Sequence, residues 1–224
     1  SGSLADHATR LLRNAKLLPA ALMARLPFRD IAAQDRFAQE HNILVLEARD
    51  LESYHHQAGA MMRIAARARV PLAVAEDAEV VMFRAEIGGE DHFAVLIGKG
   101  ADLAAPLVRL HSQCITGDVL GSLKCDCGDQ LQAAMRLMAE NGGGVLIYLA
   151  QEGRDIGLLN KMRAYALQDN GLDTVDANHA LGFDTDERVF SPAARILDAL
   201  GIARLRLITN NPDKISQLEQ CGIK

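Results

Sequence analysis

Three cysteines gathered in a short stretch of the chain constrain its fold more than any other feature. Cys114, Cys125 and Cys127 follow the spacing C-x10-C-x-C, and the fourth cysteine, Cys221, lies far from them. Thiolates from one loop and one close pair can occupy three corners of a zinc tetrahedron, provided that the intervening chain folds back on itself. A site with three protein ligands keeps a position for water, which is the arrangement of catalytic zinc.

Spacing alone leaves other interpretations of these cysteines open. They include a disulfide, a buried pair of thiols, and a closed structural site in which His111 or His179 supplies the fourth ligand. Nothing in the sequence indicates a secreted chain, and a reducing compartment favours metal binding or free thiols. Because three thiolates leave a zinc site with a net charge of about −1, we expect a nearby base or cation to assist it.

Charge and hydropathy narrow the class of protein further. The formal net charge of −5 argues against broad binding to the nucleic-acid backbone, although a few local cations would suffice for an anionic small molecule. No apolar run approaches the roughly 20 residues that span a bilayer, and the start lacks the order of a signal peptide. We therefore expect a cytoplasmic protein that binds neither nucleic acid nor membrane. Residues 1–3 resemble the remnant of an expression tag.

Two regions follow along the chain. Residues 4–70 are rich in Ala, Leu and Arg, show helical spacing and carry no chemical motif, and Pro71 marks the expected boundary. Residues 71–224 are expected to form a mixed α/β (α+β) domain whose sheet is flanked by helices. Its predicted strands are 80–85, 93–97 and 107–111, interpreted as an antiparallel set, then 145–149 and 205–208; its predicted helices are 131–138, 156–168 and 193–200.

A possible ligand site follows the predicted strand 145–149. Glu152, Gly153 and Arg154 stand at its carboxyl end just before a helix, where ligands commonly bind in α/β proteins. Gly153 allows a sharp turn, and Arg154 offers a planar fork that suits phosphate or carboxylate. The alternative is a helix-capping ion pair between Glu152 and Arg154.

A second such site lies near the end of the chain. The strand 205–208 runs into Asn211, a typical N-cap, and Pro212, which suits the first position of a helix. Free backbone N–H groups at this helix start, together with Lys214, would suit a phosphate. An ordinary, well-capped helix is the alternative.

Taken together, these segments resemble the GTP cyclohydrolase II family. The resemblance covers residues 70–224 and is carried by RLHSQCITGDVLGSLKCDCGDQL, YLAQEGRDIGLLNKMRAYALQD, GLDTVDANHALGF and RLITNNPDK. It implies a catalytic domain of that type and an enzyme that opens the imidazole ring of GTP in riboflavin synthesis. Zinc-bound water would attack the imidazole carbon of guanine. Release of formate and pyrophosphate would then give a diamino-phosphoribosylamino-pyrimidinone. It also implies Mg²⁺ on the triphosphate and a homodimer.

The resemblance assigns roles to matching positions. Cys114, Cys125 and Cys127 correspond to the zinc ligands, and Tyr165 corresponds to a tyrosine beside the zinc water. Asp186 corresponds to a proton acceptor, and Arg188 corresponds to a nucleophile that attacks the α-phosphate. For Arg188, electrostatic clamping of the α-phosphate is the simpler alternative, because a guanidinium group stays protonated. The implied nucleotide-binding positions are Arg109, Leu110, His111, Ser112, Gln113, Gln130, Glu152, Gly153, Arg154, Thr174, Thr209 and Lys214.

Departures from the family keep other functions open. Gln113 stands where the family usually has glutamate, so a negative charge is lost beside the first zinc cysteine. Residues 4–70 are interpreted as a structural or dimer-forming region. They are also interpreted as a remnant of a fused dihydroxybutanone-phosphate synthase-like domain. The alternatives are a related cyclohydrolase with another nucleotide or an incomplete reaction, and an inactive zinc protein that binds nucleotide; retention of Tyr165, Asp186 and Arg188 opposes the last.

Overall fold

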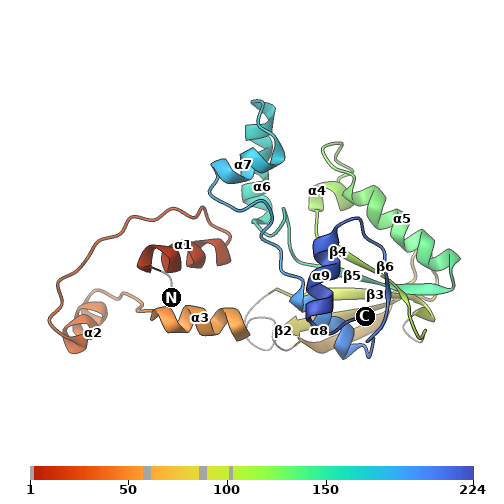
Figure 1. Ribbon diagram of the computed structural model, residues 1–224, viewed down its shortest axis with the longest axis horizontal. Coiled ribbons are helices and arrows are strands. Elements are labelled where there is room, and N and C mark those ends of the chain that lie inside the picture. The colour runs from red at the N-terminus through yellow and green to blue at the C-terminus, as the bar shows by residue number, and fades with distance from the viewer. Residues whose placement is uncertain (1–2, 58–61, 86–89, 101–102) are drawn as a thin grey trace.

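The computed structural model describes residues 3–57, 62–85, 90–100 and 103–224. An N-terminal arm, residues 3–57, carries the helices α1 (Leu4–Asn14), α2 (Ile31–Glu40) and α3 (Ala48–Gln57) and extends to one side of the sheet (Figure 1). No helix in these ranges combines the length and the apolar character that crossing a bilayer requires.

A six-stranded mixed sheet forms the body of the molecule, in the order β1-β2-β3-β5-β4-β6. The neighbours from β1 to β5 in this order are antiparallel, whereas β4 pairs in parallel with both β5 and β6. The strands are β1 (Met62–Arg69), β2 (Glu79–Ala85), β3 (His92–Gly98), β4 (Leu107–Ser112), β5 (Gly143–Leu149) and β6 (Arg206–Leu207). The predicted class, a mixed α/β fold with a helix-flanked sheet, is confirmed.

Helices cover both faces of the sheet because side chains of a strand alternate between its faces. Val95 and Ile97 of β3 pack with Met138 of α5 (Cys127–Glu140). On the other face, Ala94 packs in a cluster with Ile196 of α8 (Ser191–Ala199) and residues of α9 (Pro212–Gln220). The remaining helices are α4 (Ile115–Asp118), α6 (Gly157–Asp169) and α7 (Thr174–Ala180), and the α6–α7 pair projects beyond the sheet (Figure 1).

Two predictions about the strands are corrected. Residues 62–69 were expected in the helical region before Pro71, yet they form the edge strand β1, which pairs with β2. Its sequence, MRIAARAR, is almost wholly exposed, so the burial pattern that would mark it as a strand is absent. The strands 80–85, 93–97 and 107–111 were expected to form one antiparallel set, but β5 lies between β3 and β4. A helical crossover through α5 returns the chain to the side of β4, so β4 pairs in parallel with β5.

Candidate functional site

The largest collection of predicted site residues surrounds a pocket of about 530 Å³ at the carboxyl ends of β4, β5 and β6. Crossovers on opposite faces of a sheet leave such a crevice at the ends of parallel strands. The predicted residues that line this central pocket are Arg109, Leu110, His111, Ser112, Gln113, Cys114, Cys125, Cys127, Gln130, Gly153, Arg154, Tyr165, Thr174, Arg188 and Lys214.

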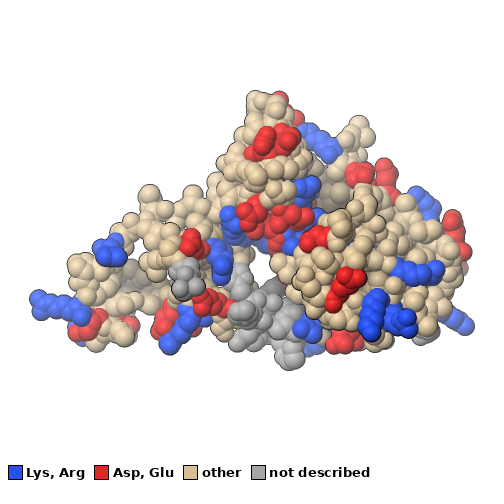
Figure 2. Space-filling model, in the orientation of Figure 1, with Lys and Arg blue, Asp and Glu red and all other residues tan. Residues whose placement is uncertain are grey.

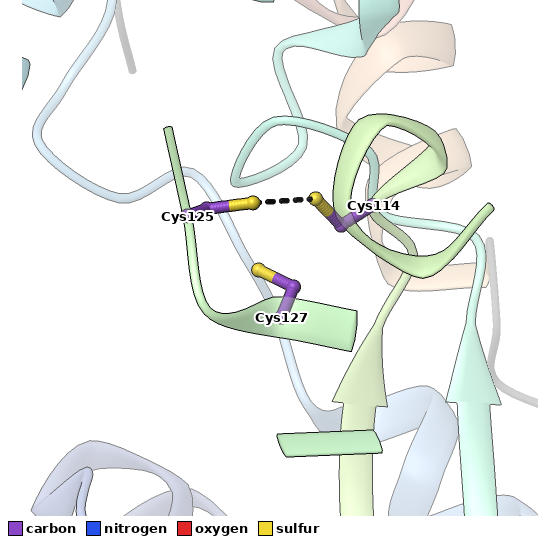
Figure 3. A group of neighbouring side chains, drawn as sticks. All are labelled: Cys114, Cys125 and Cys127. Atoms are coloured by element: carbon purple, nitrogen blue, oxygen red, sulfur yellow. Dashed lines mark hydrogen bonds between the residues drawn. The ribbon is translucent and has the colours of Figure 1, made fainter. Parts of the chain in front are cut away.

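The three cysteines converge at one end of the central pocket. Cys114 caps α4, Cys125 lies on the following loop and Cys127 begins α5, and their sulfur atoms point toward a common space (Figure 3). The three sulfurs lie within 4.8 Å of one another, and Cys114 Sγ is 3.5 Å from Cys125 Sγ. Zinc–sulfur bonds of about 2.3 Å at tetrahedral angles place sulfurs about 3.8 Å apart, so this donor set fits zinc.

Two of the alternatives for the cysteines, the disulfide and the closed site with a histidine ligand, do not match this geometry. All three are free thiols, and a sulfur–sulfur distance of 3.5 Å is far longer than a disulfide. His111 directs Nε2 to Asp118, at 3.0 Å, and His179 contacts the hydroxyl of Thr185. Among the described residues, the group able to hold a metal therefore contains only the three cysteines.

Two glycines allow the cysteine loops to approach each other. A Cβ atom on Gly117 would lie 2.8 Å from Cys125 Sγ and 3.1 Å from Cys114 Sγ, and one on Gly128 would lie 2.4 Å from the carbonyl oxygen of Gly117. Any larger residue at either position would push the ligand-bearing segments apart. Sequence patterns did not identify either glycine, although each stands within three residues of a cysteine.

The thiols differ in their tendency to ionise. Burial disfavours the Cys114 thiolate, but hydrogen bonds from Thr116, Lys161 and the Gly117 N–H outweigh it and lower the pKa. Burial, reinforced by the neighbouring thiols, raises the pKa of Cys127. Three thiolates so close together therefore need compensation by positive charge, which a divalent cation provides.

Lys161, which was not among the predicted site residues, supplies a cation beside the cysteines. Its ammonium lies 3.1 Å from Cys114 Sγ and 2.7 Å from Glu152 Oε1, and all three side chains are buried. Burial alone would lower the pKa of Lys161, but these two partners outweigh it and raise the pKa. The signal was available, because Lys161 precedes Tyr165 by one helical turn and so shares its face of α6.

A buried carboxylate fixes the backbone at the first cysteine. Asp118 accepts hydrogen bonds from the Cys114 N–H at 3.0 Å and the Tyr148 hydroxyl at 2.8 Å, and its other contact is the His111 ring. Burial would raise the pKa of Asp118, but these partners hold it below its ordinary value. His111 lines the pocket, but its ring contacts Asp118, so its side chain supports the hydrogen-bond network at Cys114.

Cations also line the central pocket. Arg109 donates to the carbonyl of Ile208 at 3.1 Å and to Gln130, and Lys214 donates to the carbonyl of Leu110 at 2.8 Å. Burial, with the nearby charges of Arg188 and Arg109, lowers the pKa of Lys214 to about 8. Asn211 caps α9 and Pro212 occupies its first turn, as predicted.

Asp186 and Arg188 form a two-point ion pair with each other. Arg188 Nε donates to Asp186 Oδ1 at 2.8 Å, its Nη2 donates to Oδ2, and Nη1 lies 3.4 Å from the Ser112 hydroxyl. Burial would raise the pKa of Asp186, but the hydrogen bonds and charge of Arg188 lower it. The guanidinium thus has a fixed anionic partner and faces the pocket.

Three predicted residues stand behind the lining of the pocket. Glu152 pairs with Lys161 and accepts from the Ile115 N–H at 2.7 Å, so it does not form the capping pair with Arg154. Asp186 pairs with Arg188, and the Thr209 hydroxyl accepts from the Asn211 N–H at 3.0 Å. Lining residues to which the resemblance assigned no role are Lys124, Asp126, Ile156, Lys161, Ala164, Gln168, Asn178, Asn210 and Asn211.

Comparison with known proteins places similar sequences in one family. Residues 62–224 match the sequence profile described as GTP cyclohydrolase II. A GTP cyclohydrolase-2 of Azospirillum brasilense is 49% identical over 223 residues, 100% of this chain and 58% of that protein. A riboflavin biosynthesis protein RibBA of Salinispora tropica is 42% identical over 97% of this chain and 56% of that protein.

A shorter relative aligns with less of the chain. A GTP cyclohydrolase-2 of an Enterobacter strain is 53% identical over 144 residues, which are 64% of this chain and 74% of that protein. The chain spans little more than half the length of the first two relatives. The profile match begins at β1 and leaves the N-terminal arm outside it.

Proposed function

The chain belongs to the GTP cyclohydrolase II family, and from this premise we propose that it opens the imidazole ring of GTP and releases formate and pyrophosphate. The observation that carries the proposal is the composition of the central pocket. Three convergent thiols line this pocket together with the cations of Arg109, Arg188 and Lys214. A guanine base with a triphosphate carries a ring to be attacked and a chain of negative charge in the same molecule.

At the base end, Cys114, Cys125 and Cys127 would hold zinc, since their sulfur donors and spacing fit it. Bound zinc would supply a Lewis acid that makes water a nucleophile near neutral pH. Lys161 offsets the negative charge of the thiolates and is itself paired with Glu152. Tyr165, whose ring lies 5.7 Å from the Lys161 ammonium, would orient the attacking water in the pocket.

At the phosphate end, the chain's own cations would bind and polarise the triphosphate, with Mg²⁺ entering on the nucleotide. Asp186 is a carboxylate and can accept a proton, while Arg188 points from this partner toward the pocket. A nucleophilic guanidine would have to be neutral, and a two-point carboxylate partner stabilises the cation instead. We therefore assign Arg188 as an electrostatic clamp on the α-phosphate rather than a covalent nucleophile.

Incubation of zinc-loaded protein with GTP and Mg²⁺, followed by separate assays for formate and pyrophosphate, tests the proposal. We expect both products in equal amounts. Nucleotide binding without either product would contradict catalysis and indicate an inactive zinc protein. Formate without pyrophosphate would indicate an incomplete reaction, and the pocket position of Gln113 makes Gln113→Glu the first variant to examine in that case.

Replacing Lys161 with methionine tests the proposed charge compensation. The variant leaves Glu152 buried without its partner and removes the cation from Cys114, so zinc affinity and formate release should each fall roughly 10- to 100-fold. Zinc affinity is measured by competition with a chelator, and circular dichroism checks that the variant is folded. Lys99→Met, which removes an exposed lysine, is the matched control. Unchanged zinc affinity and formate release in Lys161→Met would contradict this role.

The pH dependence of GTP binding tests the role of Lys214. Its pKa is lowered to about 8, so the free protein carries this charge at pH 7 and loses it as the pH rises. The KM for GTP should be flat below that pKa and rise roughly tenfold between pH 7 and pH 9, since each pH unit above the pKa costs a factor of ten in the competent form. Lys214→Arg stays protonated and should show a flat KM, while titration of GTP affects both proteins equally. Parallel profiles would contradict the assignment.

A further inference from the structure

The N-terminal arm reaches the two loops that carry charged residues of the central pocket. Lys16, just after α1, donates to the carbonyl oxygen of Asp155 at 2.9 Å and forms an ion pair with the carboxylate of the same residue. Arg13, in the last turn of α1, contacts residues 182–187. Figure 2 shows acidic and basic side chains gathered where the arm meets the body of the molecule.

The turn that Lys16 contacts has an unfavourable backbone conformation. Arg154 and Asp155 have φ values of 59° and 75°, although neither is glycine, and they stand between Gly153 and Gly157, which also have positive φ. Left-handed conformations of such residues persist only where the surroundings enforce them. Because Lys16 binds both the carbonyl and the carboxylate of Asp155, it enforces the conformation next to Arg154.

Lys16 is itself held rigidly against the body. Its carbonyl oxygen accepts a hydrogen bond at 2.9 Å from the side chain of Asn160, a fully buried residue of α6. A Cβ atom on Gly157 would lie 3.1 Å from the Cβ of Lys16, so the two backbones are in close contact. The arm is therefore docked by fixed backbone contacts and not only by a flexible lysine side chain.

Arg13 holds the second loop, which is itself hydrogen-bonded to the first. Its guanidinium donates to the carbonyl of Gly182 at 2.8 Å and lies 3.1 Å from both Asp184 and Glu187. The Glu187 N–H donates to the carbonyl of Arg154 at 3.2 Å. This loop also carries Asp186 and Arg188, so one short stretch of the arm supports both of the loops at the phosphate end.

We propose that the N-terminal arm is a positioning element of the active site, in which Arg13 and Lys16 hold the loops so that Arg154 and Arg188 face the triphosphate of GTP. The inference rests on the proposed function for its substrate. Neither residue touches the pocket lining that would contact nucleotide, and both lie outside residues 62–224, which match the family profile. The arm thus acts on the catalytic body from outside the segment that matches the family profile.

Lys16→Met and Arg13→Met test the proposal in the full chain. Without nucleotide, backbone amides of residues 153–157 and 184–188 should exchange with deuterium roughly tenfold faster than in the wild type, because local opening becomes easier. The KM for GTP should rise roughly tenfold, since the competent loop conformation is less populated, while zinc content stays at the wild-type level and kcat changes less than KM. Arg10→Met, which removes an exposed arginine of the same helix, is the matched control.

The outcomes separate the arm's role from the proposed function. Wild-type exchange rates at both loops in both variants would overturn the positioning role, and so would faster exchange with an unchanged KM. If one variant fails to fold, the other still tests the same two loops. A wild-type protein that neither binds nor hydrolyses GTP would overturn the proposed function, and the arm's support of a nucleotide site would fall with it even if exchange were faster in the variants.

Discussion

Cys125→Ser should abolish metal binding and lower formate release by roughly 1,000-fold or more, because the activation of water depends on the metal. The side chain lies 3.5 Å from Cys114 Sγ and faces the space shared by the three sulfurs, so no other described residue can take its place as a ligand. Serine keeps the size of the side chain but is a poor zinc ligand. Metal content is measured by atomic absorption and formate by a coupled dehydrogenase assay.

Cys221→Ser provides the control for this prediction. Cys221 is an exposed free thiol at the end of α9, away from the cluster, so its loss should leave metal content and formate release unchanged. Full metal content with normal formate release in Cys125→Ser would refute the catalytic zinc site. Loss of metal with normal formate release would confirm that the cysteines bind metal but contradict a role of that metal in catalysis.

Arg188→Ala should lower pyrophosphate release by roughly 1,000-fold, the effect of removing an arginine that stabilises charge on a transferring phosphoryl group. Zinc content should stay at the wild-type level, since Arg188 contacts Asp186 and Ser112 and not the cysteines. Arg188→Lys distinguishes the two roles considered for this residue. A clamp should retain part of its effect with another cation, so pyrophosphate release in Arg188→Lys should exceed that in Arg188→Ala at least roughly tenfold.

Equal loss in the lysine and alanine variants would contradict the clamp and favour a covalent role for the guanidine. Asp186→Asn gives a second comparison, because it removes the negative charge but keeps the shape. If Asp186 only orients Arg188, the pyrophosphate rate should fall without a change in its pH profile. If Asp186 accepts a proton, the acidic limb of that profile should disappear. Pyrophosphate is followed by a coupled pyrophosphatase assay.

Local sequence patterns predicted those parts of the fold whose causes are local. Short apolar runs separated by glycine-containing stretches located β2 and β3, and the helical spacing of Ala134, Met135 and Met138 located α5. The Asn211–Pro212 pair predicted the start of α9 because the cap and the fixed φ act within a single turn. β1 was missed because it is an edge strand exposed along most of its length, and pairing with β2 alone defines it.

The site was predictable to the extent that its residues carry a chemical signature. The cysteine spacing identified the metal end, and the resemblance identified most of the pocket lining. Lys161, Asp118 and Lys16 were missed because an isolated lysine or aspartate has no signature until a distant partner is known. Lys161 meets Cys114 from 47 positions away, and Lys16 meets Asp155 from 139 positions away. Asp186 and Arg188 stand two positions apart in the sequence, but this spacing did not by itself predict their ion pair.

The separation along the chain differs greatly between the two ends of the pocket. The sulfur ligands come from residues 114–127, so closing that loop costs little entropy and the metal end can form from a local segment during folding. The phosphate end draws on Arg109, Arg154, Arg188 and Lys214, which meet only once the sheet has assembled. A nascent or partly unfolded chain should therefore capture its metal before it recognises nucleotide. Destabilising substitutions far from the pocket should weaken nucleotide recognition long before they release the metal.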